Sequence, residues 1–554
     1  MPAARWTRPA TSADPERLRG APLALLAAIV ALGAALRLDQ FAAQVLLDDE
    51  WHAVHQILKR GPASLYVELG HADYGIPLAL YDWAIARTVG LSETAMRLPM
   101  MACGLATLIV FPLAVSARVG RAQALAFALL LATSPLLVAH SQIARPYAIN
   151  VFLGWVAHWA FMRYWGDGRT GAAAVYAIAA AFVVWMHMVV APFVLAPLLW
   201  AAWTIARDPR ERRERLRRLV AIAAPTLAAI VLLLGPPLYV QLQAITAKSG
   251  FAPLELNTLR GAFHLWAGTS SVAVAVGAFV LSAIGARTVW RAFPEARTGS
   301  LGLALTAAAL AISRPEWGEV PSVFGRYLMP IVPLFLLSTA VGAVAVGRAA
   351  SRAWRSPHAS VVGAALASGG TAVALTVTGP LPAWSVHPTS YRLGVAFQYD
   401  FREHRNAVLD AQRAIPLSPF WRTLAAHPPG SVVVAAAPFS FESYDWDGSR
   451  WERISRQRVI PGWLTGLCVE RRPGELPAGD GYRFTNAVRL ADVRALRALP
   501  VDYVAWQKPW LPREQDRHVR DGDDTAHCEP VLRERFGAPV YEDATVVVFR
   551  VPPE

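Results

Sequence analysis

Apolar stretches long enough to cross a lipid bilayer recur through the first two-thirds of this 554-residue chain. A spanning helix needs about 20 apolar residues, because each residue adds 1.5 Å and the hydrocarbon layer is about 30 Å thick. Only 17% of the residues are charged, against roughly 25% in soluble domains. The pattern predicts a polytopic α-helical membrane protein with about 11 spans, in a range of roughly 10–13. The expected spans are 20–37, 95–116, 123–139, 148–165, 171–187, 189–206, 219–238, 269–286, 299–313, 327–346 and 360–379.

The basic residues predict the orientation of these spans. With a cytoplasmic N-terminus, the inner segments carry 21 arginines and the short outer loops carry eight lysines and arginines. Cytoplasmic loops are enriched in Lys and Arg, so this orientation is favoured. It requires 76–89 to be a juxtamembrane helix rather than a span. We therefore expect a multi-pass protein of a bacterial inner membrane, with an uncleaved first span and the C-terminal region outside the cytoplasm.

The net charge of +13 at first suits a nucleic-acid partner, but the placement of the basic residues at span ends favours the bilayer as partner and no nucleic acid. We expect a cytoplasmic tail at 1–19 and a transmembrane module at 20–381, which includes a first outer loop at 38–94. The composition becomes mixed and charged beyond residue 381, which predicts an extracytoplasmic, periplasmic α/β domain at 382–554. Its expected strands are 430–437, 501–506 and 544–551, and its expected helices are 401–414 and 488–498.

Several side chains of this domain allow two interpretations. Cys468 and Cys528 would be able to pair in an oxidising compartment, and whether they do stays open. Asp445-Trp446-Asp447 precedes Gly-Ser and favours a turn. The tryptophans either stack on acceptor sugars or form the core of the domain; they are Trp446, Trp451, Trp463, Trp506 and Trp510.

Three consecutive carboxylates follow the first span. Asp48, Asp49 and Glu50 precede an expected helix. Carboxylates crowded at a low-dielectric boundary tend to have raised pKa values, which suits a general base. The alternative is a helix N-cap with favourable dipole charges.

Cationic and aromatic residues recur on the same expected side of the membrane. Arg145 lies in Ser141-Gln-Ile-Ala-Arg-Pro-Tyr147, His187 interrupts an apolar run, and Arg326-Tyr327 precedes another span. Each has a simpler interpretation as a span-end anchor or a core histidine. Together they would surround one outer cavity with guanidinium donors suited to a departing phosphate.

At these residues the sequence resembles the glycosyltransferase C superfamily. It is similar to bacterial protein O-mannosyltransferases and lipid A aminoarabinose transferases. The matching motifs are Asp49-Glu50, the segment 71–80, Arg97-Leu98-Pro99, Ser141 with Arg145 and Tyr147, His187, and Arg326-Tyr-Leu-Met-Pro-Ile-Val-Pro.

The resemblance implies an inverting transfer of a hexosyl or pentosyl group from a polyprenyl-phosphate donor to a hydroxyl acceptor of the cell envelope. It implies that Asp49 is the base, with Glu50 supporting it, while the assignment between Asp48 and Asp49 stays open. The donor phosphate would be bound by Arg145, Arg326, Lys59 and Arg60. Substrate contacts would come from His71, Asp73, Ser141, Tyr147, His187 and Tyr327. Asp73 departs from the family pattern, which leaves the acceptor open.

No cofactor is expected, although a divalent metal remains an alternative. His52 and His55 lie three residues apart near Asp48 and Asp49, a spacing that matches zinc sites poorly. Two other functions stay open, namely a transporter and a non-catalytic envelope scaffold. A transporter would need ionisable groups at mid-membrane and repeated, broken spans, whereas the acids here cluster at the outer edge.

Overall fold

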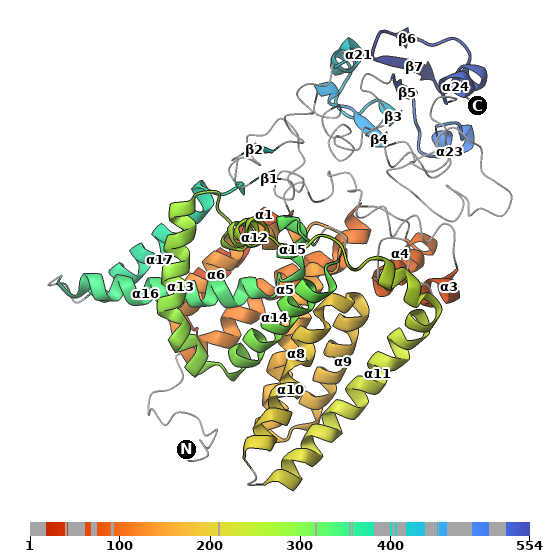
Figure 1. Cartoon of the computed structure of the whole chain (residues 1–554). Coiled ribbons are helices and arrows are strands. Elements are labelled where there is room, and N and C mark those ends of the chain that lie inside the picture. The colour runs from red at the N-terminus through yellow and green to blue at the C-terminus, as the bar shows by residue number, and fades with distance from the viewer. Residues whose placement is uncertain are drawn as a thin grey trace. The chain divides into compact units, whose positions relative to one another are not determined.

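A computed structural model gives the architecture of the chain (Figure 1). It describes residues 18–38, 41, 61–67, 75–89, 93–208, 211–315, 318–353, 356, 358–381, 399–400, 405–406, 417–437, 451, 454–461, 490–508 and 528–553. The chain divides into two compact units. The first contains 1–39, 66–77 and 99–382, and the second contains 40–65, 78–98 and 383–554.

The part of the chain before residue 382 is helical throughout its described secondary structure. Its longer helices are α1 (Ala21–Leu38), α5 (Glu93–Val119), α6 (Arg121–Thr133), α8 (Tyr147–Asp167), α9 (Thr170–Met186), α10 (Ala191–Arg207), α11 (Arg212–Ala247), α12 (Leu256–Ala267), α13 (Val272–Ala292), α14 (Pro294–Ser313), α16 (Ile331–Ala350) and α17 (Ala359–Val377). The shorter ones are α3 (Pro62–Val67), α4 (Ile76–Arg87), α7 (Pro135–His140), the 3-10 turn η1 (Met188–Val190) and α15 (Pro321–Tyr327).

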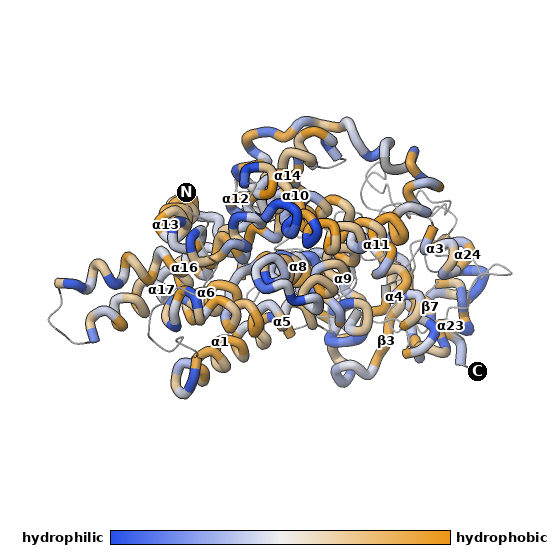
Figure 2. Tube along the Cα trace, turned by 90° about the horizontal axis from the view of Figure 1, so that it is seen from below, coloured by the Kyte–Doolittle hydropathy of each residue, from blue (hydrophilic) through white to orange (hydrophobic). Residues whose placement is uncertain are grey.

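Within the described residues, eight helices are long and apolar enough to cross a membrane, and each matches a predicted span. They are α1, α5, α10 with η1, α11, α13, α14, α16 and α17. Figure 2 shows mostly hydrophobic residues in helices such as α11, which becomes apolar after its basic first turns. The chain is therefore a polytopic α-helical membrane protein, as predicted.

The other three predicted spans are also helical but differ from the prediction. The span at 123–139 is broken, because Ser134 is extended (ψ 114°) before Pro135, which begins α7. Helix α9 is apolar but has only 17 residues. Helix α8 has 21 residues but carries Asn150, His158 and Arg163 among its apolar residues. The expected juxtamembrane helix at 76–89 corresponds to α4.

Two groups of helices share the core of the first unit. Helix α16 packs on α13, α17 and α6, while α8, α9, α10, α11 and α14 pack together beside them (Figure 1). The α13–α16 contact depends on two glycines. A Cβ on Gly285 would collide with Ser338 O, and a Cβ on Gly342 would collide with Leu281 O. Such close backbone approach is typical of membrane helices, where packing drives association.

The C-terminal unit contains a mixed five-stranded sheet in the order β4-β3-β5-β7-β6. The strands are β3 (Val433–Ala437), β4 (Arg458–Pro461), β5 (Tyr503–Gln507), β6 (Tyr541–Glu542) and β7 (Val546–Arg550). Strand β3 runs parallel to β4 and β5, whereas β7 runs antiparallel to β5 and β6. All five residues of β3 are buried, as expected for a continuous apolar run in a covered sheet. The predicted α/β class and all three predicted strands are confirmed.

The helix expected at 401–414 is contradicted where the structure describes it. Arg405–Asn406 forms β2, which pairs antiparallel with β1 at Tyr399–Asp400. The helical periodicity there was overridden by pairing with a neighbouring segment. The helix expected at 488–498 is shorter and begins at Val493 as α23 (Val493–Ala498), because Asp492 caps it by accepting a hydrogen bond from Ala495 N.

The structure describes two of the three cysteines of the chain and several of the tryptophans of this unit. Cys528 is disulfide-bonded and Cys103 is free; Cys468 lies outside the described residues. Trp506 is 1% exposed, and Trp451 is 5% exposed and stacks on Trp421 at 4.7 Å between centroids. These two tryptophans belong to the core. The turn expected at Asp445-Trp446-Asp447, and Trp463 and Trp510, lie outside the described residues.

Candidate functional site

Three segments that are far apart in the sequence meet at one end of the helical unit. Helix α8 starts there with Tyr147, α9 ends just before His187, and α15 ends with Arg326 and Tyr327. The ring of His187 lies 5.7 Å from that of Tyr147 and 5.3 Å from that of Tyr327, between centroids. We call Arg145, Tyr147, His187, Arg326 and Tyr327 the Arg–Tyr–His cluster.

Arg326 lies over both tyrosine rings of the cluster. Its guanidinium carbon is 5.5 Å from the Tyr147 ring centroid and 5.9 Å from the Tyr327 ring centroid. Cation–π contacts of this kind hold a guanidinium in place without consuming its hydrogen-bond donors. The two ring contacts fix the direction in which the guanidinium of Arg326 faces.

Two tryptophan side chains hold the segment that carries Arg326. Trp266 Nε1 donates to Gly325 O and Trp155 Nε1 donates to Pro330 O, both at 2.9 Å. Helix α15 also packs closely on α12, because a Cβ on Gly261 would collide with Pro321. The position of Arg326 therefore depends on tertiary contacts on both sides of it in the sequence.

His187 lies between the spanning helices α9 and α10, in the extended residue that separates them. Burial, together with the nearby charges of Arg145 and Arg326, lowers the pKa of His187 to about 3. His187 as a residue is half-buried, and its Nδ1 is enclosed and has no hydrogen-bond partner among the described residues. His187 is therefore a neutral imidazole at physiological pH, and the positive charge of the cluster comes from the two arginines.

The loop that leads to Arg145 and Tyr147 is fixed by buried hydrogen bonds. Ser141 is fully buried, and its hydroxyl donates to Leu137 O at 2.6 Å. The hydroxyl of Ser141 also lies where a Cβ on Gly104 would be, so α5 and this loop are in close contact. Ser141 thus contributes to the packing of this loop against α5, and its expected role as a substrate contact stays a prediction.

The end of the first span is attached to the same loop. Gln142 Nε2 donates to the backbone oxygen of Arg37. The buried Arg37 guanidinium donates to Gly33 O, Leu131 O and Ala132 O at 2.9, 3.0 and 3.2 Å. The chain therefore leaves α1 beside the loop that carries Arg145, and the acidic segment at 48–50 follows ten residues after Leu38 in the sequence.

Five predicted site residues are thus brought together, while others are not tested. Asp48, Asp49, Glu50, Lys59, Arg60, His71 and Asp73 lie outside the described residues. His52 and His55, which were considered as metal ligands, lie outside them too. Among the residues that the structure does describe, no group of three or more His, Cys, Asp or Glu side chains is arranged to hold a metal ion.

Two polar residues beside the cluster were not predicted. His140 lies 4.9 Å from Tyr147 between ring centroids. Asn150 is 1% exposed and lies one helical turn beyond Tyr147 on the same face of α8. Neither amide atom of Asn150 has a hydrogen-bond partner within the described part of the chain. A buried amide in an apolar helix is costly unless it is hydrogen-bonded, so Asn150 was detectable in the sequence as a candidate.

Comparisons with known proteins give structural similarity only. No family model and no curated protein matches the chain. ArnT from Cupriavidus metallidurans is 14% identical, with a TM-score of 0.43 over 96% of this chain and 98% of that chain. The oligosaccharyltransferase AglB from Archaeoglobus fulgidus is 14% identical, with a TM-score of 0.38 over 88% and 69%. The arabinosyltransferase EmbB from Mycobacterium smegmatis is 15% identical, with a TM-score of 0.38 over 76% and 44%. All three are membrane glycosyltransferases of the glycosyltransferase C superfamily, but similarity at this level assigns no function to this chain.

Proposed function

We propose that the chain is a membrane glycosyltransferase that moves a sugar from a polyprenyl-phosphate donor to a hydroxyl acceptor of the cell envelope. The sugar is a hexosyl or pentosyl group, and transfer inverts the anomeric carbon. The observation that carries the proposal is the Arg–Tyr–His cluster. It presents two guanidinium groups and three aromatic rings at one end of an apolar helical unit.

The cluster has the properties that a lipid-phosphate site needs. Guanidinium groups bind phosphate oxygens through paired, charge-assisted hydrogen bonds. The surrounding helices are apolar, so an isoprenoid tail would remain in the bilayer while its phosphate reaches the cluster. The tyrosine rings and the neutral imidazole of His187 provide flat apolar faces and a hydrogen-bonding atom for a sugar.

The proposed reaction uses the acidic segment as the base. Asp49 takes the proton from the acceptor hydroxyl, with Glu50 supporting it and Asp48 as the alternative base. The acceptor oxygen then forms a bond to the anomeric carbon as the bond from that carbon to the phosphate oxygen breaks. Arg145 and Arg326 stabilise the charge that develops on the phosphate, and Lys59 and Arg60 add to that stabilisation. The lipid phosphate leaves as the monoester.

The proposal places this chemistry on the outer face of a bacterial inner membrane. The arginine distribution supports a cytoplasmic N-terminus, and the last turn of α1, which contains Arg37, then lies on the outer side beside the loop that carries Arg145. The C-terminal α/β unit would be periplasmic. His71 and Asp73 remain candidates for acceptor contacts.

Transfer from defined donors tests the proposal. Purified protein is incubated with synthetic polyprenyl-phosphate sugars, each with a radiolabelled sugar, and with membrane extract as acceptor. We expect release of polyprenyl phosphate together with a labelled product. Asp49→Asn is expected to abolish transfer and to retain donor binding, because the base is lost and the phosphate site is intact. Normal turnover by Asp49→Asn would reject this base, and the matched Asp48→Asn variant then tests the alternative.

The same assay separates the enzyme from the two other functions. A transporter would move a labelled lipid or sugar across proteoliposomes without breaking the glycosidic bond to phosphate. A scaffold would do neither. Transfer that continues unchanged in excess chelator would exclude a requirement for a divalent metal.

A further inference from the structure

A cavity lies beside the middle of α8, at Trp155, Val156 and Trp159, and a polar pocket continues from it toward the end of α8 farther from the Arg–Tyr–His cluster. Tyr147 begins α8 and Asp167 ends it, so the two ends of this 21-residue helix are roughly 30 Å apart, the thickness of a bilayer core. The empty space in and in front of this cavity amounts to about 630 Å³, open solvent at its mouth included. Residues of α5, α6, α8, α14 and α16 line it.

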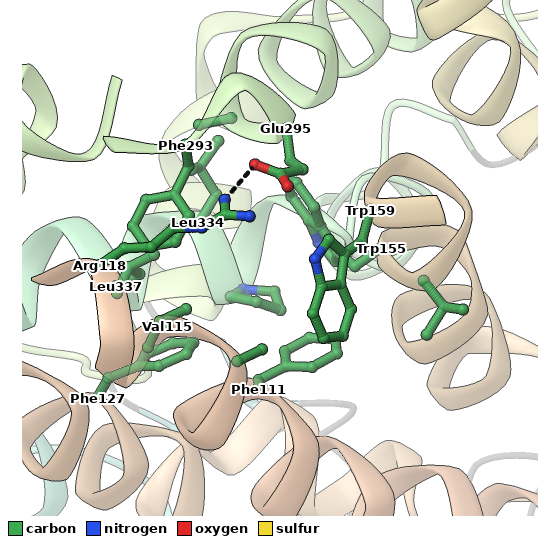
Figure 3. Close-up of a pocket in the computed structure, with 14 residues that line it drawn as sticks. Phe111, Val115, Arg118, Phe127, Trp155, Trp159, Phe293, Glu295, Leu334 and Leu337 are labelled. Atoms are coloured by element: carbon green, nitrogen blue, oxygen red, sulfur yellow. Dashed lines mark hydrogen bonds and ion pairs between the residues drawn. The ribbon is translucent and has the colours of Figure 1, made fainter. Parts of the chain in front are cut away.

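The wall of this cavity is aromatic and aliphatic. Figure 3 shows Phe111, Phe127, Trp155, Leu334 and Leu337 around the space, with Arg118 and Glu295 at one side. Trp155 is held rigidly, because its Nε1 donates to Pro330 O and its ring lies where a Cβ on Gly299 would be. The cavity is therefore a preformed apolar space rather than a gap that neighbouring side chains are free to fill.

Charged groups of both signs surround the mouth. Arg118 Nη1 pairs with Glu295 Oε2 at 2.8 Å, and Glu295 has a side chain that is only 10% exposed. A polar pocket shares Arg118, Trp159 and Glu295 with the cavity and adds Arg163 and Asp167. Asp167 also faces Arg169 at 3.9 Å. The apolar cavity and the polar pocket therefore adjoin, and between them they are lined by two arginines and two carboxylates, Arg118, Arg163, Glu295 and Asp167.

This balance of charge selects the class of ligand. A purely anionic head group would meet the carboxylates of Glu295 and Asp167, and an uncharged one would form no charge-assisted contact with any of these groups. A head group that carries a phosphate and a primary ammonium matches both pairs, with the phosphate on the arginines and the ammonium on the carboxylates. Helix α14 begins at Pro294 beside the mouth, and its N-terminal dipole further favours the phosphate there.

We propose that this cavity binds a bilayer phospholipid of the phosphatidylethanolamine class, with one acyl chain in the aromatic cavity and the zwitterionic head group on Arg118, Arg163, Glu295 and Asp167. The lipid would contact α16 at Leu334 and Leu337, on the helix that follows Arg326 and Tyr327. This site is separate from the proposed donor site and does not depend on the proposed transfer reaction.

Lipid competition measured by native mass spectrometry tests this assignment. Full-length protein is delipidated in mild detergent and mixed with equal amounts of phosphatidylethanolamine, phosphatidylcholine and phosphatidylglycerol that have identical acyl chains. We expect phosphatidylethanolamine to be retained. Phosphatidylcholine has no ammonium N–H donor, and phosphatidylglycerol has no cation. Equal retention of all three, or preference for phosphatidylglycerol, would overturn the assignment.

Three variants locate the retained lipid. Ala114 lines the cavity, so Ala114→Phe fills it and is expected to abolish retention. The double variant Arg163→Gln/Asp167→Asn changes only exposed residues at the mouth and leaves the Arg118–Glu295 pair intact; it is expected to weaken retention about tenfold. Arg213→Gln, at an exposed position of α11 outside the cavity, is the control and should retain the lipid.

Two further results would also refute the proposal. If both Ala114→Phe and the double variant retained phosphatidylethanolamine, the lipid would bind elsewhere on the protein. Displacement of phosphatidylethanolamine from the wild-type protein by stoichiometric polyprenyl phosphate would assign the cavity to the donor tail instead. Because these measurements read lipid binding alone, failure of the transfer reaction would not change their outcome.

Discussion

Removal of the Arg326 guanidinium is expected to weaken the binding of polyprenyl phosphate strongly. The guanidinium carbon of Arg326 lies 5.5 and 5.9 Å from two tyrosine ring centroids, so it is oriented before the ligand arrives. A hydrogen bond to a charged group contributes about 1.5–3 kcal/mol. With about 2 kcal/mol lost, Arg326→Ala should raise Kd roughly 30-fold, since 1.4 kcal/mol corresponds to a factor of ten.

Two further variants make this measurement specific. Arg326→Lys keeps the charge but loses the planar fork and its contact with the tyrosine rings, so it should give a smaller increase, of roughly fivefold, in Kd. Arg260→Ala removes an exposed arginine from α12, which packs beneath α15, and should leave Kd unchanged. Binding is measured by tryptophan fluorescence during titration with undecaprenyl phosphate in detergent. The reasoning is refuted if Arg326→Ala changes Kd less than twofold, or if Arg260→Ala has the same effect.

The remaining predictions concern pH and packing. The pKa of His187 is depressed to about 3, so between pH 3 and 6.5 the unfolded chain binds more protons than the folded chain. The free energy of unfolding therefore falls as pH falls through that window. The thermal midpoint of His187→Gln should decline less than that of wild type between pH 7 and 5, because the variant has no imidazole to protonate. Gly342→Ala should lower the unfolding free energy by about 1–3 kcal/mol through overpacking, whereas Gly277→Ala on α13, where a Cβ meets open space, should be neutral or stabilising in the same melting assay. Desolvation alone would raise the pKa of Asp543, but hydrogen bonds from Ser418, Thr545 and Val546 together hold that pKa well below its usual range. Asp543→Ala should therefore lower the thermal midpoint of the C-terminal unit at pH 7. The gap between the variant and wild type should become smaller as pH falls below about 4, because the wild-type carboxylate then becomes protonated.

The membrane spans were predictable because hydrophobicity over about 20 residues is a local property of the sequence. The break at Ser134 also has a local cause in Pro135. The span predicted at 148–165 corresponds to α8, in which Asn150 and His158 interrupt the apolar sequence. His158 is fully buried and hydrogen-bonded to Thr298 Oγ1 at 2.8 Å and Phe193 O at 3.0 Å. These hydrogen bonds of His158 come from residues distant in the sequence, so no local pattern predicts them.

The candidate site was predictable from the sequence only in part. The residue types of Arg145, His187 and Arg326 stand out in apolar surroundings, and their expected side of the membrane follows from the order of the spans. Their ring and guanidinium contacts arise from packing among α8, α9 and α15, which no short motif specifies. The Arg118–Glu295 pair joins residues 177 positions apart, so no local sequence pattern predicts the cavity beside it.

Crosslinking of a photoreactive donor analogue tests the central claim most directly. A polyprenyl phosphate with a diazirine on the isoprene unit next to the phosphate is bound to the full-length protein and irradiated, and the labelled peptides are identified by mass spectrometry. Labelling is expected within 141–147 and 321–330, the segments that carry Arg145 and Arg326, and undecaprenyl phosphate should suppress it. Labelling confined to the C-terminal unit or to the Arg118 end of α5 would contradict the proposed donor site.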